Sequence, residues 1–151
     1  MQLTLIRHGE AAAAVHGDDI KRPLTERGQQ QAAQTAAYLH DVIEPDLFVV
    51  SPLLRAQQTL AHLQQLFPQV PVVVCNAIKP EDDPRAAIEW LSHLDCQSVV
   101  VVCHMNVIGY MAQLLTSEPF YPFALAEAAV YDQVVIAQGF SSKIKGFIPT
   151  L

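Results

Sequence analysis

The sequence predicts an α/β domain with three layers, in which helices cover both faces of a largely parallel sheet. Two observations lead to this prediction. Short apolar runs alternate four times with segments that have the apolar spacing of helices. The length of 151 residues, of which 51% are apolar and 16% charged, suits one domain over residues 1–151 with a core of its own.

The strands of this alternation are predicted at short apolar runs, and the first run suits a strand that is buried on both faces of a sheet. They are the short runs at residues 3–6, 46–50, 72–75 and 98–103, of which the last, SVVVVC, is the most apolar. Two further strands are predicted at residues 128–137 and 143–148, with Gly139 in the turn between them.

The helices are predicted from their start signals and from the apolar stripes that follow these signals. A loop over 10–22 precedes the first helix, and Thr25 is placed to cap it. Ser51-Pro52 and Asp83-Pro84 each combine a capping residue with a proline suited to the first helical position. Ser51 is interpreted as a cap and not as a nucleophile, because no G-x-S-x-G elbow surrounds it. The last helix is predicted at residues 106–115.

Composition excludes several classes of partner and compartment. The net charge of −6 and the lack of a block of like charges argue against a nucleic-acid partner. Cys75, Cys96 and Cys103 form no CxxC pair, and this odd number of cysteines suits a reducing compartment. The start of the chain lacks a signal-peptide pattern, and no apolar run suits a membrane span. A cytoplasmic protein without a membrane partner is expected.

Polar residues follow each predicted strand, and the carboxyl ends of parallel strands meet at one edge of a sheet. The residues expected together at this edge are Arg7 and His8 after the first strand, Arg55 one turn into the helix after the second, Glu81 and Asp82 in the loop after the third, and His104 after the fourth. Two arginines beside two histidines would repel a divalent cation, so the sequence predicts no metal site. Arginine side chains match phosphate oxygens, and a phosphate-sized anion site is predicted instead.

A histidine in such a site has a specific chemical use. Neighbouring positive charges disfavour the imidazolium form of His8, and a neutral imidazole is a nucleophile toward phosphorus. We expect His8 to form a phosphohistidine that water then hydrolyses. Arg7, Arg55 and a protonated His104 would balance the charge of the transferring phosphoryl group.

Four blocks of the sequence together resemble a known family. IRHGE resembles the RHG signature of the histidine phosphatase superfamily, and RPLTERG, SPLLRAQQT and VVVVCHM resemble three further blocks of that family in the same order. The resemblance covers most of the chain and is greatest to the short SixA-type phosphohistidine phosphatases. It implies a phosphoglycerate mutase-like fold and catalysis without a metal or an organic cofactor.

The resemblance also implies roles for individual residues. His8 matches the phosphorylated nucleophile, and Arg7, Arg55 and His104 match the rest of the phosphate pocket. Arg22 matches a further arginine that can bind the phosphate, although a solvated loop cation is an equal alternative. Larger members of the family carry an acidic proton donor for the leaving group. Here that role is unassigned, with the carboxyl groups of residues 81 and 82 as the nearest candidates.

The function expected from the sequence is removal of phosphoryl groups from phosphohistidine on a partner protein, such as a histidine-containing phosphotransfer domain. One alternative is a phosphatase for a small phosphate monoester. Another is a non-catalytic adaptor module that binds phosphate. The His8–His104 pair argues against the adaptor, because binding alone requires no nucleophile.

Overall fold

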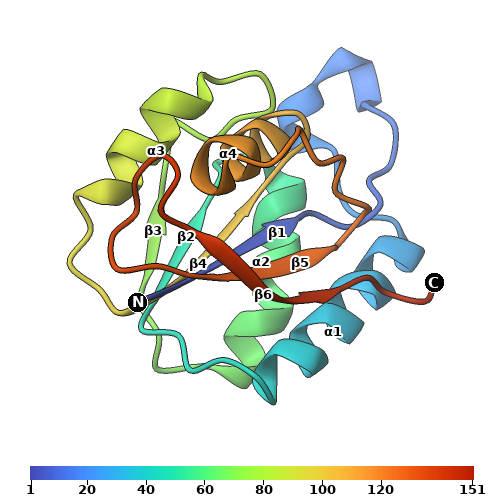
Figure 1. The fold of residues 1–151 in the computed structure, drawn as a ribbon. Helices are drawn as coiled ribbons and strands as arrows, with labels where there is room; N and C mark the ends of the chain where they lie inside the picture. The colour runs from blue at the N-terminus through green and yellow to red at the C-terminus, as the bar shows by residue number, and fades with distance from the viewer.

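A six-stranded sheet forms the centre of the fold, with the strand order β3-β2-β4-β1-β5-β6 (Figure 1). The computed structural model describes residues 1–151. The strands are β1 (Gln2–Arg7), β2 (Leu47–Val50), β3 (Val72–Val74), β4 (Ser98–Cys103), β5 (Ala128–Asp132) and β6 (Ser142–Phe147). The first four are parallel to their neighbours in the order β3-β2-β4-β1, whereas β5 is antiparallel to β1 and to β6. The predicted largely parallel sheet is confirmed.

Helices cover both faces of this sheet and complete the three layers. They are α1 (Glu26–His40), α2 (Leu54–Leu66), α3 (Pro84–Ser92) and α4 (Val107–Thr116). Apolar residues of α1 and α2 pack in one buried cluster with one face of the sheet. Those of α3 and α4 pack in a second cluster with the other face. The two helix pairs lie on opposite sides of the sheet in Figure 1. No helix combines the length and hydrophobicity that crossing a membrane requires.

The two central strands, β1 and β4, are apolar on both sides because both clusters need side chains from them. Leu5 and Val101 belong to the cluster under α3 and α4, and Ile6 and Val102 belong to the cluster under α1 and α2. The strands pair in register from Gln2 with Ser98 to Arg7 with Cys103. This register makes the two strands end level with each other, so the residues that follow them are neighbours.

Two of the three predicted helix caps are confirmed, and the third is wrong. Thr25 accepts a hydrogen bond from the Gly28 N–H at 3.0 Å, and Asp83 accepts one from the Arg85 N–H at 2.9 Å. Ser51 does not cap α2, which begins at Leu54. The Ser51 N–H still donates to the Val102 carbonyl of β4 at 3.1 Å, so the chain continues the parallel ladder at this residue and cannot yet turn into a helix.

The fifth strand ends earlier than predicted, at residue 132 instead of 137. Its partner β1 begins at Gln2, which pairs with Asp132, so the chain beyond Asp132 has no strand beside it. Gln133 instead accepts a hydrogen bond from the Ser141 hydroxyl at 2.8 Å and closes a turn. Gly139 lies in this turn with a φ of 82°, as its prediction in a turn requires.

Gly28 allows α1 to pack directly against the segment that follows His8. A Cβ added at Gly28 would lie 2.1 Å from the Glu10 carbonyl oxygen, which is backbone and has little room to move. Alanine favours a helix over glycine by about 1 kcal/mol. We nevertheless expect Gly28→Ala to lower the free energy of unfolding by roughly 2–4 kcal/mol, because the clash outweighs the propensity.

Urea-induced unfolding measures this change. Gln30→Ala is the matched control, since Gln30 is exposed on the same helix. A Gly28→Ala protein as stable as the wild type would show that the close packing of α1 on this segment is not required.

Candidate active site

Two histidines from different strands meet at the carboxyl edge of the sheet. His8 follows β1 and His104 follows β4, and the His8 N–H donates to the Cys103 carbonyl at 3.1 Å. The centroids of the two imidazole rings are 5.1 Å apart. Both rings are buried, with 8% of His8 and none of His104 exposed. The register of β1 on β4 therefore brings together two residues that are 96 positions apart in the sequence.

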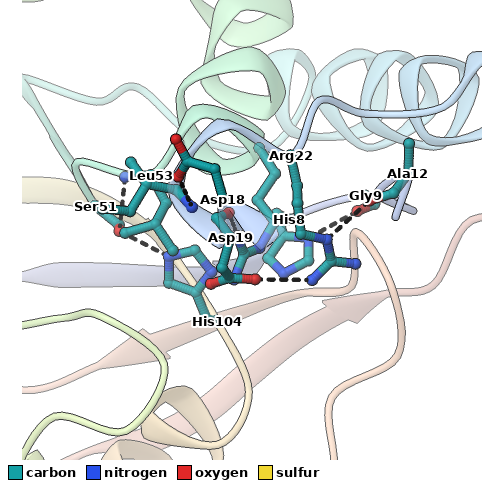
Figure 2. A network of polar contacts seen from close by, with 11 residues as sticks. His8, Gly9, Ala12, Asp18, Asp19, Arg22, Ser51, Leu53 and His104 are labelled. Carbon is teal, nitrogen blue, oxygen red and sulfur yellow. Dashed lines mark hydrogen bonds and ion pairs between the residues drawn. The ribbon is translucent and has the colours of Figure 1, made fainter. Parts of the chain in front are cut away.

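Hydrogen bonding fixes the tautomer of His8. Its Nδ1 lies 2.7 Å from the carbonyl oxygen of Gly9 (Figure 2). A carbonyl oxygen only accepts, so Nδ1 carries the proton and Nε2 keeps a free lone pair. Burial and the charges of Arg55, Arg7 and Arg22 together lower the pKa of His8 to about 4, against the hydrogen bond to Gly9, which acts to raise it. The ring is neutral at pH 7, as the sequence predicted, and Nε2 is the nitrogen with the free lone pair.

The buried Arg55 and the half-buried Arg7 are each held at the far end of the guanidinium group. Arg7 Nη1 donates to the Phe123 carbonyl at 2.8 Å. Arg55 Nη1 donates to the Asp19 carbonyl at 2.9 Å, and its Nη2 lies 3.3 Å from the Asp19 carboxylate. The Nε groups of both arginines are buried and have no partner within the protein. They are therefore candidate N–H donors for an anion, since buried polar groups are as a rule paired.

The first turns of α2 are fastened to the segment after His8, and this fixes the position of Arg55. The Gly9 N–H donates to the Thr59 hydroxyl at 3.1 Å, and that hydroxyl donates to the Arg55 carbonyl at 2.9 Å. On the other side, the Ala126 N–H donates to the His8 carbonyl at 3.0 Å. Three segments far apart in the sequence are thus joined by hydrogen bonds of the Thr59 side chain and of the backbone, and these bonds hold the catalytic candidates in place.

His104 is neutral in the free protein. Burial, together with the neighbouring His8, Arg55 and Arg7, lowers the pKa of His104 to about 2. A protonated His104 was expected only while a phosphoryl group is being transferred, so that expectation stays a prediction. Its Nε2 lies 2.7 Å from the Ser51 hydroxyl oxygen, and its Nδ1 is buried without a partner within the protein.

Sequence reasoning missed Asp19, although this residue contacts two of the predicted arginines. Its carboxylate lies 3.1 Å from Arg22 Nη1 (Figure 2). This contact is made in addition to its contact with Arg55. Burial acts to raise the pKa of Asp19, but hydrogen bonds and charges from Arg22 and Arg55 outweigh it and lower the pKa, so the carboxylate is ionised. The only signal in the sequence was an acidic pair, Asp18-Asp19, in the loop between the arginines.

Arg22 lies at the rim of this cluster. Its Nε donates to the Ala12 carbonyl at 2.8 Å, and 30% of its side chain is exposed. Its charge contributes to the lowered pKa of His8, so it is close enough to the nucleophile to act on it electrostatically. These contacts show that Arg22 is tied to the site through Asp19 and is not a freely solvated loop cation.

The two carboxylates predicted as possible proton donors make other contacts. Asp82 accepts a hydrogen bond from the Lys79 N–H at 2.8 Å and pairs with the Lys79 ammonium group at 3.0 Å. Glu81 is exposed and accepts a hydrogen bond from the Asn106 side chain at 3.1 Å. Neither contacts the two histidines or the arginines, and a role as proton donor stays a prediction. No three His, Cys, Asp or Glu side chains are grouped so as to hold a metal ion.

The site as built can hold a tetrahedral anion against a nucleophile. Two arginine Nε groups and His104 Nδ1 provide nitrogen atoms without partners, and His8 provides a neutral ring with a free lone pair. Fixed positive charge combined with a neutral nucleophile suits attack on a phosphoryl group, whose oxygens carry the negative charge.

Comparisons with known proteins agree with this chemistry. A sequence model of the Histidine phosphatase superfamily (branch 1) matches residues 3–79. Phosphohistidine phosphatase SixA of Escherichia coli (strain K12) is 31% identical over 127 residues, which cover 78% of this chain and 76% of that protein. A SixA homolog of Haemophilus influenzae is 27% identical over 143 residues, covering 84% and 87% of the two chains. A solved structure of the protein histidine phosphatase SixA complexed with tungstate aligns with a TM-score of 0.87 at 27% identity, over 99% of this chain and 97% of that one.

The pKa of His8 provides a test of the site's electrostatics. We expect NMR titration of the His8 ring to give a pKa of about 4 in the wild-type protein. Arg55→Gln removes one of the positive charges that disfavour imidazolium, so it should raise the pKa of His8.

Arg85→Gln is the matched control for this titration, because Arg85 is exposed on α3 away from the cluster. It should leave the pKa of His8 unchanged. A wild-type His8 that titrates with the ordinary pKa of about 6.5 would contradict the description of a neutral nucleophile.

Proposed function

Because this chain belongs to the histidine phosphatase superfamily, we propose that it removes phosphoryl groups from phosphohistidine on a partner protein, through a covalent phosphohistidine at its own His8. The protein is an enzyme of that superfamily and is similar to SixA. The observation that carries the proposal is the buried neutral His8, which has a free Nε2 and unpaired arginine Nε groups beside it.

The first chemical step transfers the phosphoryl group to His8. Its Nε2 lone pair forms a bond to phosphorus while the bond between phosphorus and the substrate's imidazole nitrogen breaks. The leaving imidazole takes up a proton and departs as a neutral ring. The N–H donors of Arg7, Arg55 and His104 balance the charge on the oxygens of the transferring group.

The second step returns the enzyme to its starting state. A water molecule attacks the phosphorus of phospho-His8, the bond between phosphorus and Nε2 breaks, and inorganic phosphate is released. The Gly9 carbonyl, which accepts from Nδ1, keeps the ring in one orientation through both steps. Asp19 interacts with Arg22 and Arg55, so its ionised carboxylate partly neutralises the arginines before phosphate binds.

The lack of a cavity at the site supports a protein substrate. The five surface cavities of the structure lie elsewhere, and none is lined by Arg7, His8, Arg55 or His104. A side chain that projects from a folded partner can reach a shallow site, whereas small substrates are usually enclosed. The tungstate in the similar SixA structure is a tetrahedral oxyanion like phosphate, which supports the anion site. Phosphohistidine also needs less help from a protein acid, because protonated imidazole leaves readily.

Replacing the nucleophile tests the proposed mechanism. We expect His8→Ala to lower kcat/KM by a factor of roughly 10³ or more on a phosphohistidine protein, because the proposed mechanism has no covalent step without His8 Nε2. His93→Ala is the matched control, since His93 is exposed at the end of α3 and should be dispensable. Full activity in His8→Ala would end the proposal.

The choice of substrate is tested with the wild-type enzyme. We expect a higher kcat/KM for a phosphorylated histidine-containing phosphotransfer domain than for small monoesters such as p-nitrophenyl phosphate, because no cavity at the site encloses a small leaving group. A preference for monoesters would favour a small-molecule phosphatase. Tungstate binding without hydrolysis of either substrate would favour an adaptor module.

A further inference from the structure

Ser51 directly follows β2, and the shorter of its two side-chain hydrogen bonds is made with His104. The Ser51 residue is fully buried, and its hydroxyl oxygen lies 2.7 Å from His104 Nε2 (Figure 2). Its backbone N–H is fixed to the Val102 carbonyl at 3.1 Å, two residues before His104. The hydroxyl is therefore held against one nitrogen of the imidazole ring by the pairing of β2 with β4.

The hydrogen atoms around Ser51 determine the direction of this bond. The Leu53 N–H donates to the Ser51 oxygen at 3.3 Å, so the oxygen already accepts one hydrogen bond. The hydroxyl hydrogen of Ser51 is still available to be donated, and His104 Nε2 is the acceptor within hydrogen-bond distance. If Nε2–H donated to Ser51 instead, the hydroxyl hydrogen would be buried with no acceptor, at a cost of about 1–3 kcal/mol. The favoured arrangement has the hydroxyl donating to Nε2.

We propose that Ser51 is a positioning residue that holds neutral His104 in the tautomer with the proton on Nδ1. The Nδ1 atom is buried, makes no hydrogen bond within the protein and belongs to the ring beside His8. In this tautomer Nδ1–H is a donor for a phosphoryl oxygen. In the other tautomer Nδ1 presents a lone pair, which repels the same oxygen. Ser51 thus decides whether His104 assists the reaction without gaining a positive charge.

The consequence for catalysis rests on the proposed function, but the tautomer itself does not. It is measured directly in the free wild-type protein, from the nitrogen chemical shifts of the His104 ring in ¹⁵N NMR, with His104→Gln to identify the signals. We expect a protonated Nδ1 and an unprotonated Nε2. A protonated Nε2 with a bare Nδ1 would overturn the inference, whatever substrate the enzyme uses.

Ser51→Ala then links the tautomer to function. We expect the shifts of His104 to move toward the Nε2–H form, tungstate to bind more weakly, and kcat/KM to fall roughly 10- to 100-fold, as for the loss of one transition-state donor. Ser98→Ala is the matched control. Ser98 is a buried serine at the opposite end of β4 whose hydroxyl has no partner, so neither the shifts nor tungstate binding should change.

A double mutant separates positioning from a general structural role. If Ser51 acts through His104, adding Ser51→Ala to His104→Ala should cause no further loss of kcat/KM. Additive losses, or a loss of activity in Ser51→Ala with the His104 tautomer unchanged, would contradict the inference. If no phosphohistidine substrate is hydrolysed, the proposed function fails, while the NMR shifts and tungstate binding still decide the role of Ser51.

Discussion

The parallel pairing of β1 with β4 is the constraint on which the rest of the site depends. It makes Arg7 and Cys103 level partners, and the next residue of each strand is a histidine. Both strands are buried between two helix layers, so neither can slip by one residue without turning its apolar side chains to the wrong cluster. The position of His8 relative to His104 is therefore set by the hydrophobic core and not by contacts between the rings.

A buried cluster of cations and imidazoles is costly to fold, and the structure limits this cost in two ways. The histidines stay neutral, with pKa values lowered mainly by burial. The arginines keep their charge but place their outer nitrogens on oxygen atoms, from the Phe123 carbonyl for Arg7 and from Asp19 for Arg55. What stays unpaired is the inner Nε of each arginine. These unpaired Nε groups lower the stability of the free protein, and an anion that accepted hydrogen bonds from them would restore it.

The sequence predicted the positions of the site residues better than their protonation and their hydrogen-bond partners. Apolar runs that end on Arg7, His8 and His104 are local patterns, and the edge where they meet follows from the parallel topology. The neutral state of His104 in the free protein was not predicted, because the depth of its burial and the distance to His8 are properties of the folded chain. Ser51 was misread as a cap, since the pattern Ser-Pro does not show that the ladder with β4 continues through it. Asp19 was missed because a pair of acidic residues in a loop has no periodicity to mark it.

The central claim is that phosphorus is carried on one nitrogen of one histidine, and trapping the intermediate tests it most directly. The enzyme is mixed with a ³²P-labelled phosphohistidine protein and quenched in alkali, in which phosphohistidine survives, and the labelled residue and its isomer are identified. The account predicts a label on His8 at Nε2, because Nδ1 is committed to the Gly9 carbonyl. A label at Nδ1 or on another residue would contradict this claim, and so would the absence of any label during rapid turnover.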